Sequence, residues 1–336
     1  MPDPSSFAGA DTSTNPWTRP ALILVATDLS DLDRLMPHAL EQASESGARL
    51  ILFHVMGTSA AVATDAIGMP YYDPSSALEF ATKSLESWCE LAGRQGIACD
   101  ALVREGHPGQ NITAAIRQFH ADRVLLGTRS RSRLGKLLLG SVAEQVLRSV
   151  NLPVITVGPE ARVSAAGRER VVLHATTLKE TSYPSAELAG QIAANQGAKL
   201  LLLHVLPPLD QRGAGDPAAE YIGRSGQPAA LDSAALHELS LMARKIAAAQ
   251  PGIPVCPAIE PVVVHGNPSI EILATAVERD VNLIVLGATE RSAFANLTRD
   301  RIIYRVLAHA RCPVMTLRES QATLAPADKH GIALHR

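Results

Sequence analysis

The sequence predicts an α/β fold of two tandem units, each a doubly wound parallel sheet covered by helices. Two observations predict this class. Short, continuous apolar runs alternate with segments of helical periodicity, as expected for parallel strands that are buried on both faces. The same segments then occur a second time in the same order, which indicates a tandem duplication. Because crossovers between parallel strands are right-handed, ligands are expected at the carboxyl ends of the strands, near the topological switch point.

Five short segments recur in order in the two halves of the 336-residue chain. The matching pairs are 21–30 and 170–179, 48–55 and 198–205, 105–108 and 265–268, 122–128 and 282–288, and 151–157 and 311–317. The offset is 150 residues in the second pair (204 − 54) and 160 in the last pair (313 − 153), so one insertion lies between them. Chance would not keep five such landmarks in order.

We therefore expect two units, 20–158 and 169–318, joined by a linker at 159–168. The polar, proline-rich arm at 1–19 is expected to be disordered, and the tail at 319–336 to be loose.

The apolar runs predict the strands of the first unit, and the spacing of apolar residues predicts its helices. The runs are ILV, LILFHV, VLLG and VITV. Helical periodicity covers Leu32–Ser46 and Ile112–Phe119. A further helix opens at Gly140-Ser141, because the apolar residues after it share one face. These are Val142, Ala143, Val146, Leu147 and Val150.

Composition excludes several classes of protein. The chain is 46% hydrophobic, which is enough for two cores, and its net charge of −2 provides no global field for nucleic acid or a membrane surface. It contains neither an apolar run of eighteen residues nor a signal peptide. The four cysteines are far apart and form no C-x-x-C motif, so we expect reduced thiols in a cytoplasmic protein.

A predicted anion site follows the fourth strand of the first unit. This buried strand ends at Gly127, a basic loop follows it, and Gly140-Ser141 opens the next helix. The backbone N–H groups at a helix start and the positive end of its dipole favour a bound phosphate. The loop is not a Walker A motif, because no G-x-x-x-x-G-K-[ST] string occurs here.

The spacing of this loop resembles the nucleotide loop of the universal stress protein family: Gly, two residues, Gly, nine residues, Gly-Ser/Thr. Here the string is Gly127, Ser130 and Gly140-Ser141, so every position but the second glycine matches. The resemblance implies sheets of strand order 3-2-1-4-5 in the adenine nucleotide alpha-hydrolase-like, HUP-type Rossmann-like fold. It also implies ATP, with or without Mg²⁺, and a cytoplasmic stress-response regulator without a dedicated reaction.

The same resemblance assigns ligand roles within the first unit. Asp28, after the first strand, would accept hydrogen bonds from the ribose, although a helix N-cap is the alternative role for this residue. Val55 matches the position whose backbone holds the adenine. The candidate cofactor-binding residues are Ala26, Thr27, Asp28, Val55, Gly127, Thr128, Arg129, Ser130, Arg131, Gly140, Ser141, Val142 and Ala143. No residue is assigned a catalytic or metal-ligand role.

Three features of the first unit have two interpretations each. Ser130 replaces a glycine that would permit positive φ, yet its hydroxyl and N–H are both phosphate donors. The basic side chains of the loop either neutralise phosphate or are simply solvated. His54, which recurs as His204, is interpreted as a core residue whose ring is hydrogen-bonded rather than as a base or metal ligand.

The second unit has lost these features. Asp28 corresponds to Thr177, Ser130 to Glu290, and Gly140-Ser141 to Asp300-Arg301. A carboxylate at a helix start occupies the phosphate position and repels an incoming anion. We therefore expect a single nucleotide site per chain, with the second unit as a structural or regulatory copy.

Assembly and function complete the predictions. Each unit ends in an apolar strand, and unpaired edges of this kind invite association, so the fifth strands are expected to pair in a homodimer or an intramolecular pseudo-dimer. Three functional classes remain open. They are a nucleotide-binding regulator with an unidentified protein partner, a slow ATPase or self-phosphorylating enzyme, and a protein-interaction module with a vestigial nucleotide site.

Overall fold

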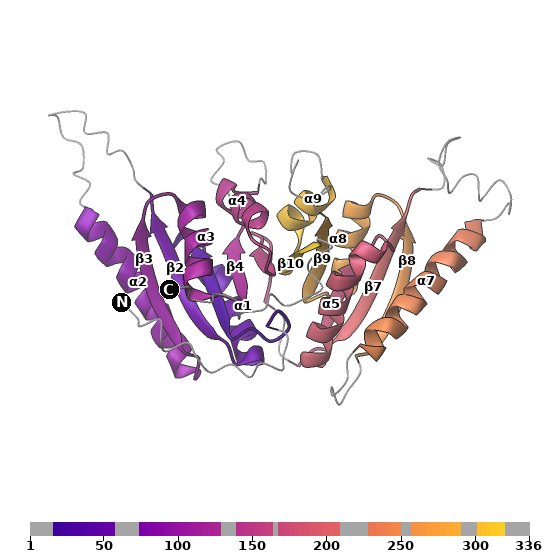
Figure 1. The fold of residues 1–336 in the computed structure, drawn as a ribbon, viewed down its shortest axis with the longest axis horizontal. Helices are drawn as coiled ribbons and strands as arrows, with labels where there is room; N and C mark the ends of the chain where they lie inside the picture. The colour runs from indigo at the N-terminus through magenta and orange to yellow at the C-terminus, as the bar shows by residue number, and fades with distance from the viewer. Residues whose placement is uncertain are drawn as a thin grey trace, which may run out of the picture.

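The computed structural model describes residues 16–57, 74–128, 139–163, 167–208, 228–249, 257–289 and 301–319. Its strands form one ten-stranded sheet of order β3-β2-β1-β4-β5-β10-β9-β6-β7-β8 (Figure 1). Each half has the expected order 3-2-1-4-5, counted along its own sequence, and all neighbours within a half are parallel. The predicted fold class is therefore confirmed.

The first unit alternates strand and helix throughout. Its elements are β1 (Leu22–Thr27), α1 (Leu32–Ser46), β2 (Arg49–Met56), α2 (Pro74–Arg94), β3 (Cys99–Glu105), α3 (Pro108–Phe119), β4 (Arg123–Gly127), α4 (Ser141–Ser149) and β5 (Val154–Val157). The predicted helix at Leu32–Ser46 is found with the same bounds, and the one at Ile112–Phe119 begins four residues earlier, at Pro108. Proline fits this first position, because its missing N–H would have no partner inside the helix.

The second unit repeats this order. Its elements are β6 (Val171–Ala175), a 3₁₀ turn at Glu180–Ser182, α5 (Tyr183–Asn195), β7 (Lys199–Leu206), α7 (Pro228–Ala248), β8 (Ile259–His265), α8 (Pro268–Glu278), β9 (Leu283–Thr289), α9 (Arg301–His309) and β10 (Val314–Glu319). No helix in the described part of the chain is both long and apolar enough to span a membrane.

Two hydrophobic clusters cover the two faces of the sheet, and each extends through both units. Helices α3, α4, α8 and α9 pack in one cluster, and α1, α2, α5 and α7 in the other. Successive residues of β1 alternate between them, with Leu24 in the first and Val25 in the second, because strand side chains point to opposite faces in turn. Both residues are fully buried, which explains the continuous apolar runs of the strands.

The fifth strands join the two units in the middle of the sheet. β5 and β10 pair antiparallel, with Ile155 opposite Met315 and both side chains buried. On either side of this pair, Thr156 Oγ1 donates to the Val314 carbonyl (3.2 Å). Thr316 Oγ1 donates in turn to the Val154 carbonyl (3.4 Å). This reciprocal pattern is that of a twofold contact, so the predicted intramolecular pairing is confirmed.

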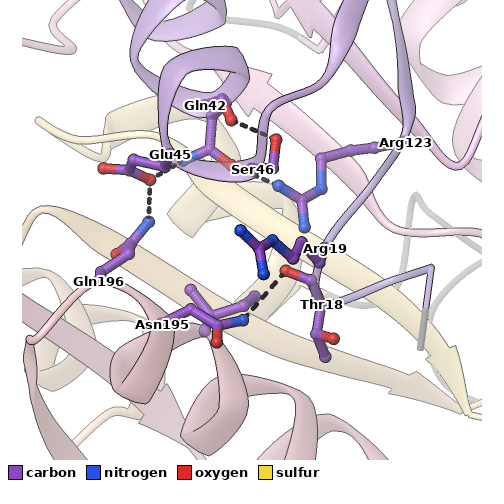
Figure 2. Close-up of a pocket in the computed structure, with 9 residues that line it drawn as sticks. Thr18, Arg19, Gln42, Glu45, Ser46, Arg123, Asn195 and Gln196 are labelled. Atoms are coloured by element: carbon purple, nitrogen blue, oxygen red, sulfur yellow. Dashed lines mark hydrogen bonds between the residues drawn. The ribbon is translucent and has the colours of Figure 1, made fainter. Parts of the chain in front are cut away.

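A second contact between the units surrounds a cavity of about 140 Å³ (Figure 2). The buried Arg123 of the first unit donates to Gln42 Oε1 (2.5 Å) and to the Trp17 carbonyl (2.6 Å). Asn195 of the second unit donates to the Thr18 carbonyl (3.5 Å). Burial lowers the pKa of Arg123 to about 10, so the side chain stays cationic at neutral pH. The end of the N-terminal arm, which we expected to be disordered, is therefore bonded to both units.

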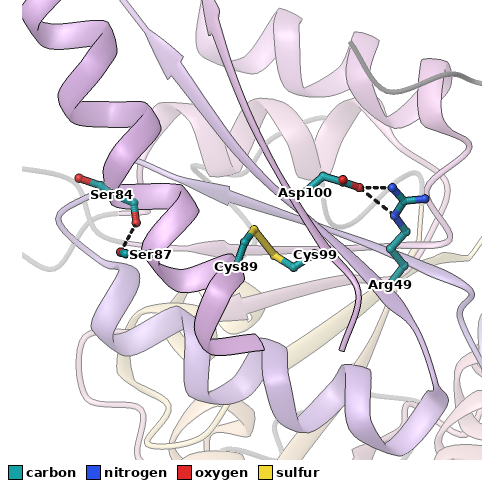
Figure 3. The surroundings of a disulfide bond; sticks show 6 residues. All are labelled: Arg49, Ser84, Ser87, Cys89, Cys99 and Asp100. Atoms are coloured by element: carbon teal, nitrogen blue, oxygen red, sulfur yellow. Dashed lines mark hydrogen bonds and ion pairs between the residues drawn. A yellow bond between two sulfur atoms is a disulfide. The ribbon is translucent and has the colours of Figure 1, made fainter. Parts of the chain in front are cut away.

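Two of the four cysteines form a disulfide, so the expectation that all four are reduced thiols was wrong. Cys89 of α2 and Cys99 of β3 form a disulfide, with 5.0 Å between their Cα atoms (Figure 3). The short turn after α2 returns the chain along the helix, so residues ten apart in sequence face each other across the helix–strand contact. Cys312 is a buried free thiol. Burial raises its pKa to about 12, so the thiol stays protonated at neutral pH. Cys256 lies outside the described residues.

The duplicated histidines are hydrogen-bonded, as predicted, but they are half-buried rather than part of the core. His54 Nδ1 and the Thr27 carbonyl are 2.9 Å apart, and His204 Nδ1 lies at the same distance from the Thr176 carbonyl. A third histidine, His174 of β6, is fully buried, and its Nδ1 lies 3.0 Å from the Val285 carbonyl. Burial lowers the pKa of His174 to about 4, so the ring is neutral at neutral pH.

The strand pairing predicts the behaviour of the isolated first unit. A fragment that ends near Gly158 exposes the edge of β5, including Val154 and Ile155, which are buried in the full chain. Unpaired N–H and C=O groups beside apolar side chains promote association. We therefore expect the fragment to dimerise or aggregate, as measured by light scattering after gel filtration. A stable, soluble monomer at high concentration would contradict the structural role given to this pair.

Buried His174 predicts a dependence of stability on pH. Between about pH 6.5 and 4 the unfolded chain binds a proton that the folded chain excludes, so the free energy of unfolding falls as the pH is lowered through this range. The variant His174→Val introduces the residue found at the corresponding position of the first unit, Val25. It should reduce the loss of stability on acidification by about 2 to 3 kcal/mol, at 1.36 kcal/mol per pH unit.

Urea unfolding of the parent and the variant at pH 7 and pH 4.5 measures this difference. His38 is also buried with a pKa of about 4, but it is present in both proteins and its contribution cancels. An identical pH dependence in the two proteins would show that His174 is not the group responsible.

Candidate functional site

The candidate site lies where the sheet of the first unit reverses its winding. β1 has β2 on one side and β4 on the other. The chain therefore extends the sheet from β1 first in one direction, through β2 and β3, and then in the other, through β4 and β5. The space beyond the carboxyl ends of such neighbouring strands is where doubly wound folds bind ligands. A cavity of about 200 Å³ opens there, beside the first turn of α4.

Most of the residues that the sequence singled out line this cavity. Those from the predicted set are Ala26, Thr27, Asp28, Val55, Gly127, Gly140, Ser141, Val142 and Ala143. They come from the ends of β1, β2 and β4 and from the start of α4, and the end of β1 at Thr27 lies 114 residues before the start of α4 at Ser141 (141 − 27). The fold therefore brings the acidic end of β1 and the glycine-initiated helix to the same cavity.

The start of α4 is suited to an external acceptor. Its N-cap residue is Gly140, with φ −64° and ψ 145°, and a glycine has no side chain with which to cap the helix. The Gly140 N–H itself donates to the Thr128 carbonyl (3.1 Å), which ties the helix start to the end of β4. The first N–H groups of a helix have no partner within it. An anion in the cavity could therefore accept hydrogen bonds from this first turn.

Gly127 has a steric role at the end of β4. A Cβ atom at this position would lie only 2.3 Å from Oδ2 of Asp31. Only glycine therefore allows the Asp31 carboxylate to approach the strand so closely. The other oxygen of Asp31 accepts a hydrogen bond from Thr27 Oγ1 (2.6 Å), which fixes the orientation of the carboxylate.

Two carboxylates with different surroundings border the cavity. Burial raises the pKa of Asp31 above its usual range, and the nearby Asp28 carboxylate acts in the same direction, against the Thr27 hydrogen bond and Arg34. Asp28 is exposed and forms a turn in which Oδ1 accepts from the Ser30 N–H (2.9 Å) and the Ser30 hydroxyl (2.6 Å). The N-cap of α1 is Asp31, so Asp28 is not the cap that the alternative interpretation proposed.

One described member of the predicted set, Thr128, is not among the lining residues. Thr128 is buried beyond the end of β4, and its N–H donates to the Val157 carbonyl (3.2 Å), so its backbone is used in the sheet. Arg129, Ser130 and Arg131 lie outside the described residues. The role of the basic loop therefore stays a prediction.

Sequence reasoning missed several residues of the cavity. They are Asp31, Phe53, Pro108, Ile112 and Leu126. Pro108 ends one of the five duplicated segments, so a signal for it existed but was used only to detect the repeat. Asp31 could have been found as a second acidic residue just before a helix, three positions after Asp28.

The second unit keeps the backbone turn of the site but not its acidic group. Leu29 and Leu178 both adopt positive φ, 71° and 61°, after β1 and β6 respectively. In the second unit Thr177 takes the place of Asp28, and its hydroxyl lies 2.8 Å from that of Ser182. Glu290 and Asp300, which we expect to repel an anion, lie outside the described residues.

Curated relatives of the chain are universal stress proteins. One from Thermus aquaticus is 32% identical over 140 residues, which is 40% of this chain and 96% of that protein. Another, from Mycolicibacterium smegmatis, is 25% identical over 319 residues and covers 88% of this chain and 96% of its own length. The second alignment therefore extends over both units.

A solved structure and a family profile agree with these relatives. The crystal structure of a universal stress protein from Archaeoglobus fulgidus superposes with a TM-score of 0.67, covering 91% of this chain and 99% of that one. At 20% identity, this likeness shows the fold. The profile of the universal stress protein family matches residues 22–158 and again residues 169–318. The chain therefore belongs to the universal stress protein family, in a tandem form with two domains.

Proposed function

We propose that the first domain binds one adenine nucleotide, ATP in the first instance, and that the chain acts as a stress-response regulator rather than as a dedicated enzyme. The observation that carries the proposal is the start of α4, where a glycine N-cap leaves the first-turn N–H groups facing a cavity at the switch point. Family membership supports the stress-response role.

The chemistry of the cavity supports a nucleotide rather than a free phosphate. Phe53, Val55 and Ile112 provide an apolar wall that suits a purine base. Asp28 is exposed at the end of β1, where a carboxylate can accept hydrogen bonds from ribose hydroxyls. The phosphates would then lie at the N-terminus of α4, the positive end of the helix dipole. A magnesium ion would enter with them, because Mg²⁺ is usually held by substrate phosphates and one or two carboxylates.

Two further elements of the proposal rest on the family and the sequence. The proposed location is the cytoplasm. The disulfide between Cys89 and Cys99 does not support this location, since disulfides are rare in reducing compartments. A regulatory protein partner is proposed because the sequence shows no constellation of nucleophile and base that would make the nucleotide a substrate.

Titration with ATP and magnesium tests the site directly. We expect one nucleotide per chain by calorimetry, because the second domain lacks the matching acidic and glycine residues. The variant Gly140→Asp should bind ATP at least about tenfold more weakly, which corresponds to about 1.4 kcal/mol. The new carboxylate caps α4 and repels the phosphates, and Asp is a favoured N-cap residue, so the fold should be retained.

Gly93→Asp is the matched control. It adds the same charge at an exposed position of α2, where an added Cβ atom would meet no neighbouring element within 4 Å. It should leave the affinity unchanged. Two equal sites per chain, or a Gly140→Asp variant that binds ATP as the parent does, would contradict the assigned site.

Phosphate release separates the regulator from the enzyme. At saturating ATP and magnesium, we expect no phosphate release above that of the Gly140→Asp variant, because the sequence shows no constellation of nucleophile and base. Intact protein mass should likewise show no added phosphate after incubation with ATP. Release or self-phosphorylation that disappears in Gly140→Asp would favour the slow enzyme. Absence of both nucleotide binding and release would favour the interaction module.

A further inference from the structure

The second domain contacts α4 of the first domain just before the helix begins. The hydroxyl of Tyr304, on α9, accepts a hydrogen bond from the backbone N–H of Leu139 (2.9 Å). Leu139 is buried and directly precedes Gly140, the N-cap of α4. One hydrogen bond from the second domain therefore fixes the backbone immediately before the proposed phosphate site.

The second domain also contacts the other end of α4. Arg318, near the end of β10, donates from Nη1 to the Arg148 carbonyl (3.2 Å) and to Asn151 Oδ1 (3.3 Å). Arg148 lies in the last turn of the helix, whose carbonyls have no partner within the helix. A cation at this end also complements the helix dipole. The helix is thus held at both ends by residues of the other domain.

These contacts are not a consequence of the pseudo-twofold symmetry. With the 160-residue offset of the last repeated segment (313 − 153), Tyr304 corresponds to Glu144 and Arg318 to Gly158. Glu144 forms an ion pair with Arg148 inside its own helix (2.6 Å), and Gly158 has no side chain. The side chains of Tyr304 and Arg318 that contact α4 therefore have no counterparts in the first domain.

We infer that the second domain positions the nucleotide site of the first, and that Tyr304 and Arg318 are the positioning residues. This inference rests on the proposed function, because Tyr304 and Arg318 contact α4, the helix that is proposed to bind the phosphates. The N–H groups of α4 bind phosphate well only if the helix start is held in one place, since a site that must be ordered on binding loses affinity. The two domains are thereby coupled, because a change at α9 or β10 changes nucleotide affinity in the first domain.

The decisive variant is Tyr304→Phe, which removes one hydroxyl and keeps the ring. A net hydrogen bond is worth about 1 kcal/mol, so amide exchange at Leu139 should become about fivefold faster without nucleotide, as measured by NMR. The Kd for ATP should rise by about three- to tenfold. Arg318→Met should also raise the Kd.

Tyr183→Phe on α5 and Arg305→Met on the exposed side of α9 are the matched controls. Neither should change the exchange rate at Leu139 or the Kd for ATP.

The two readouts separate the positioning role from the proposed function. Faster Leu139 exchange together with a weaker Kd, at a melting temperature lowered by no more than a few degrees, supports the inference. Unchanged exchange in Tyr304→Phe overturns it, whatever the nucleotide result. Faster exchange with an unchanged Kd also overturns it, because the hydrogen bond would then be only structural. If the parent binds no ATP, the proposed function fails, and with it the positioning role.

Discussion

The antiparallel pairing of β5 with β10 determines how every other part of the molecule is placed. An apolar fifth strand left at an open edge would promote association, and each domain closes the edge of the other. The same pairing makes the two hydrophobic clusters continuous across the domains, so each face of the sheet is covered by helices from both. It also brings α9 beside α4, since both helices connect directly to the paired strands (Figure 1).

Much of this arrangement could be predicted because its signals are local and repeated. Continuous apolar runs specify buried parallel strands, and duplication doubles each signal, so the strands and the contact between the two fifth strands could be predicted from the residues. The strand order 3-2-1-4-5 was implied by the family resemblance instead, and the register of Ile155 opposite Met315 was known only from the structure. The site was accessible for a similar reason. A strand that ends at Gly127 and a helix that starts at Gly140 must meet at the carboxyl edge of the sheet. Fixed topology thus converts two separate motifs into one cavity.

The features that the sequence did not predict all depend on side-chain proximity between elements. Asp31 joins the cavity because Gly127 permits its approach, and no pattern in α1 records a contact with β4. Cys89 and Cys99 pair because a short turn places α2 along β3, whereas their spacing matches no familiar cysteine motif. Trp17 is bonded through its carbonyl to buried Arg123, so composition alone could not place the end of the arm. Periodicity indicates which face is buried but not which partner it meets.

Duplication within one chain explains how the two domains could acquire different roles. In a dimer of identical subunits, each substitution appears on both sides of the axis, so a tyrosine placed to contact the opposite loop would also replace Glu144 within α4 itself. That substitution would remove the ion pair of Glu144 with Arg148. In a tandem chain the second copy varies independently while β5 and β10 keep it in place. Tyr304 and Arg318 could therefore replace the equivalents of Glu144 and Gly158 without altering α4. The asymmetry would then permit one domain to carry the proposed ligand site while the other supports it.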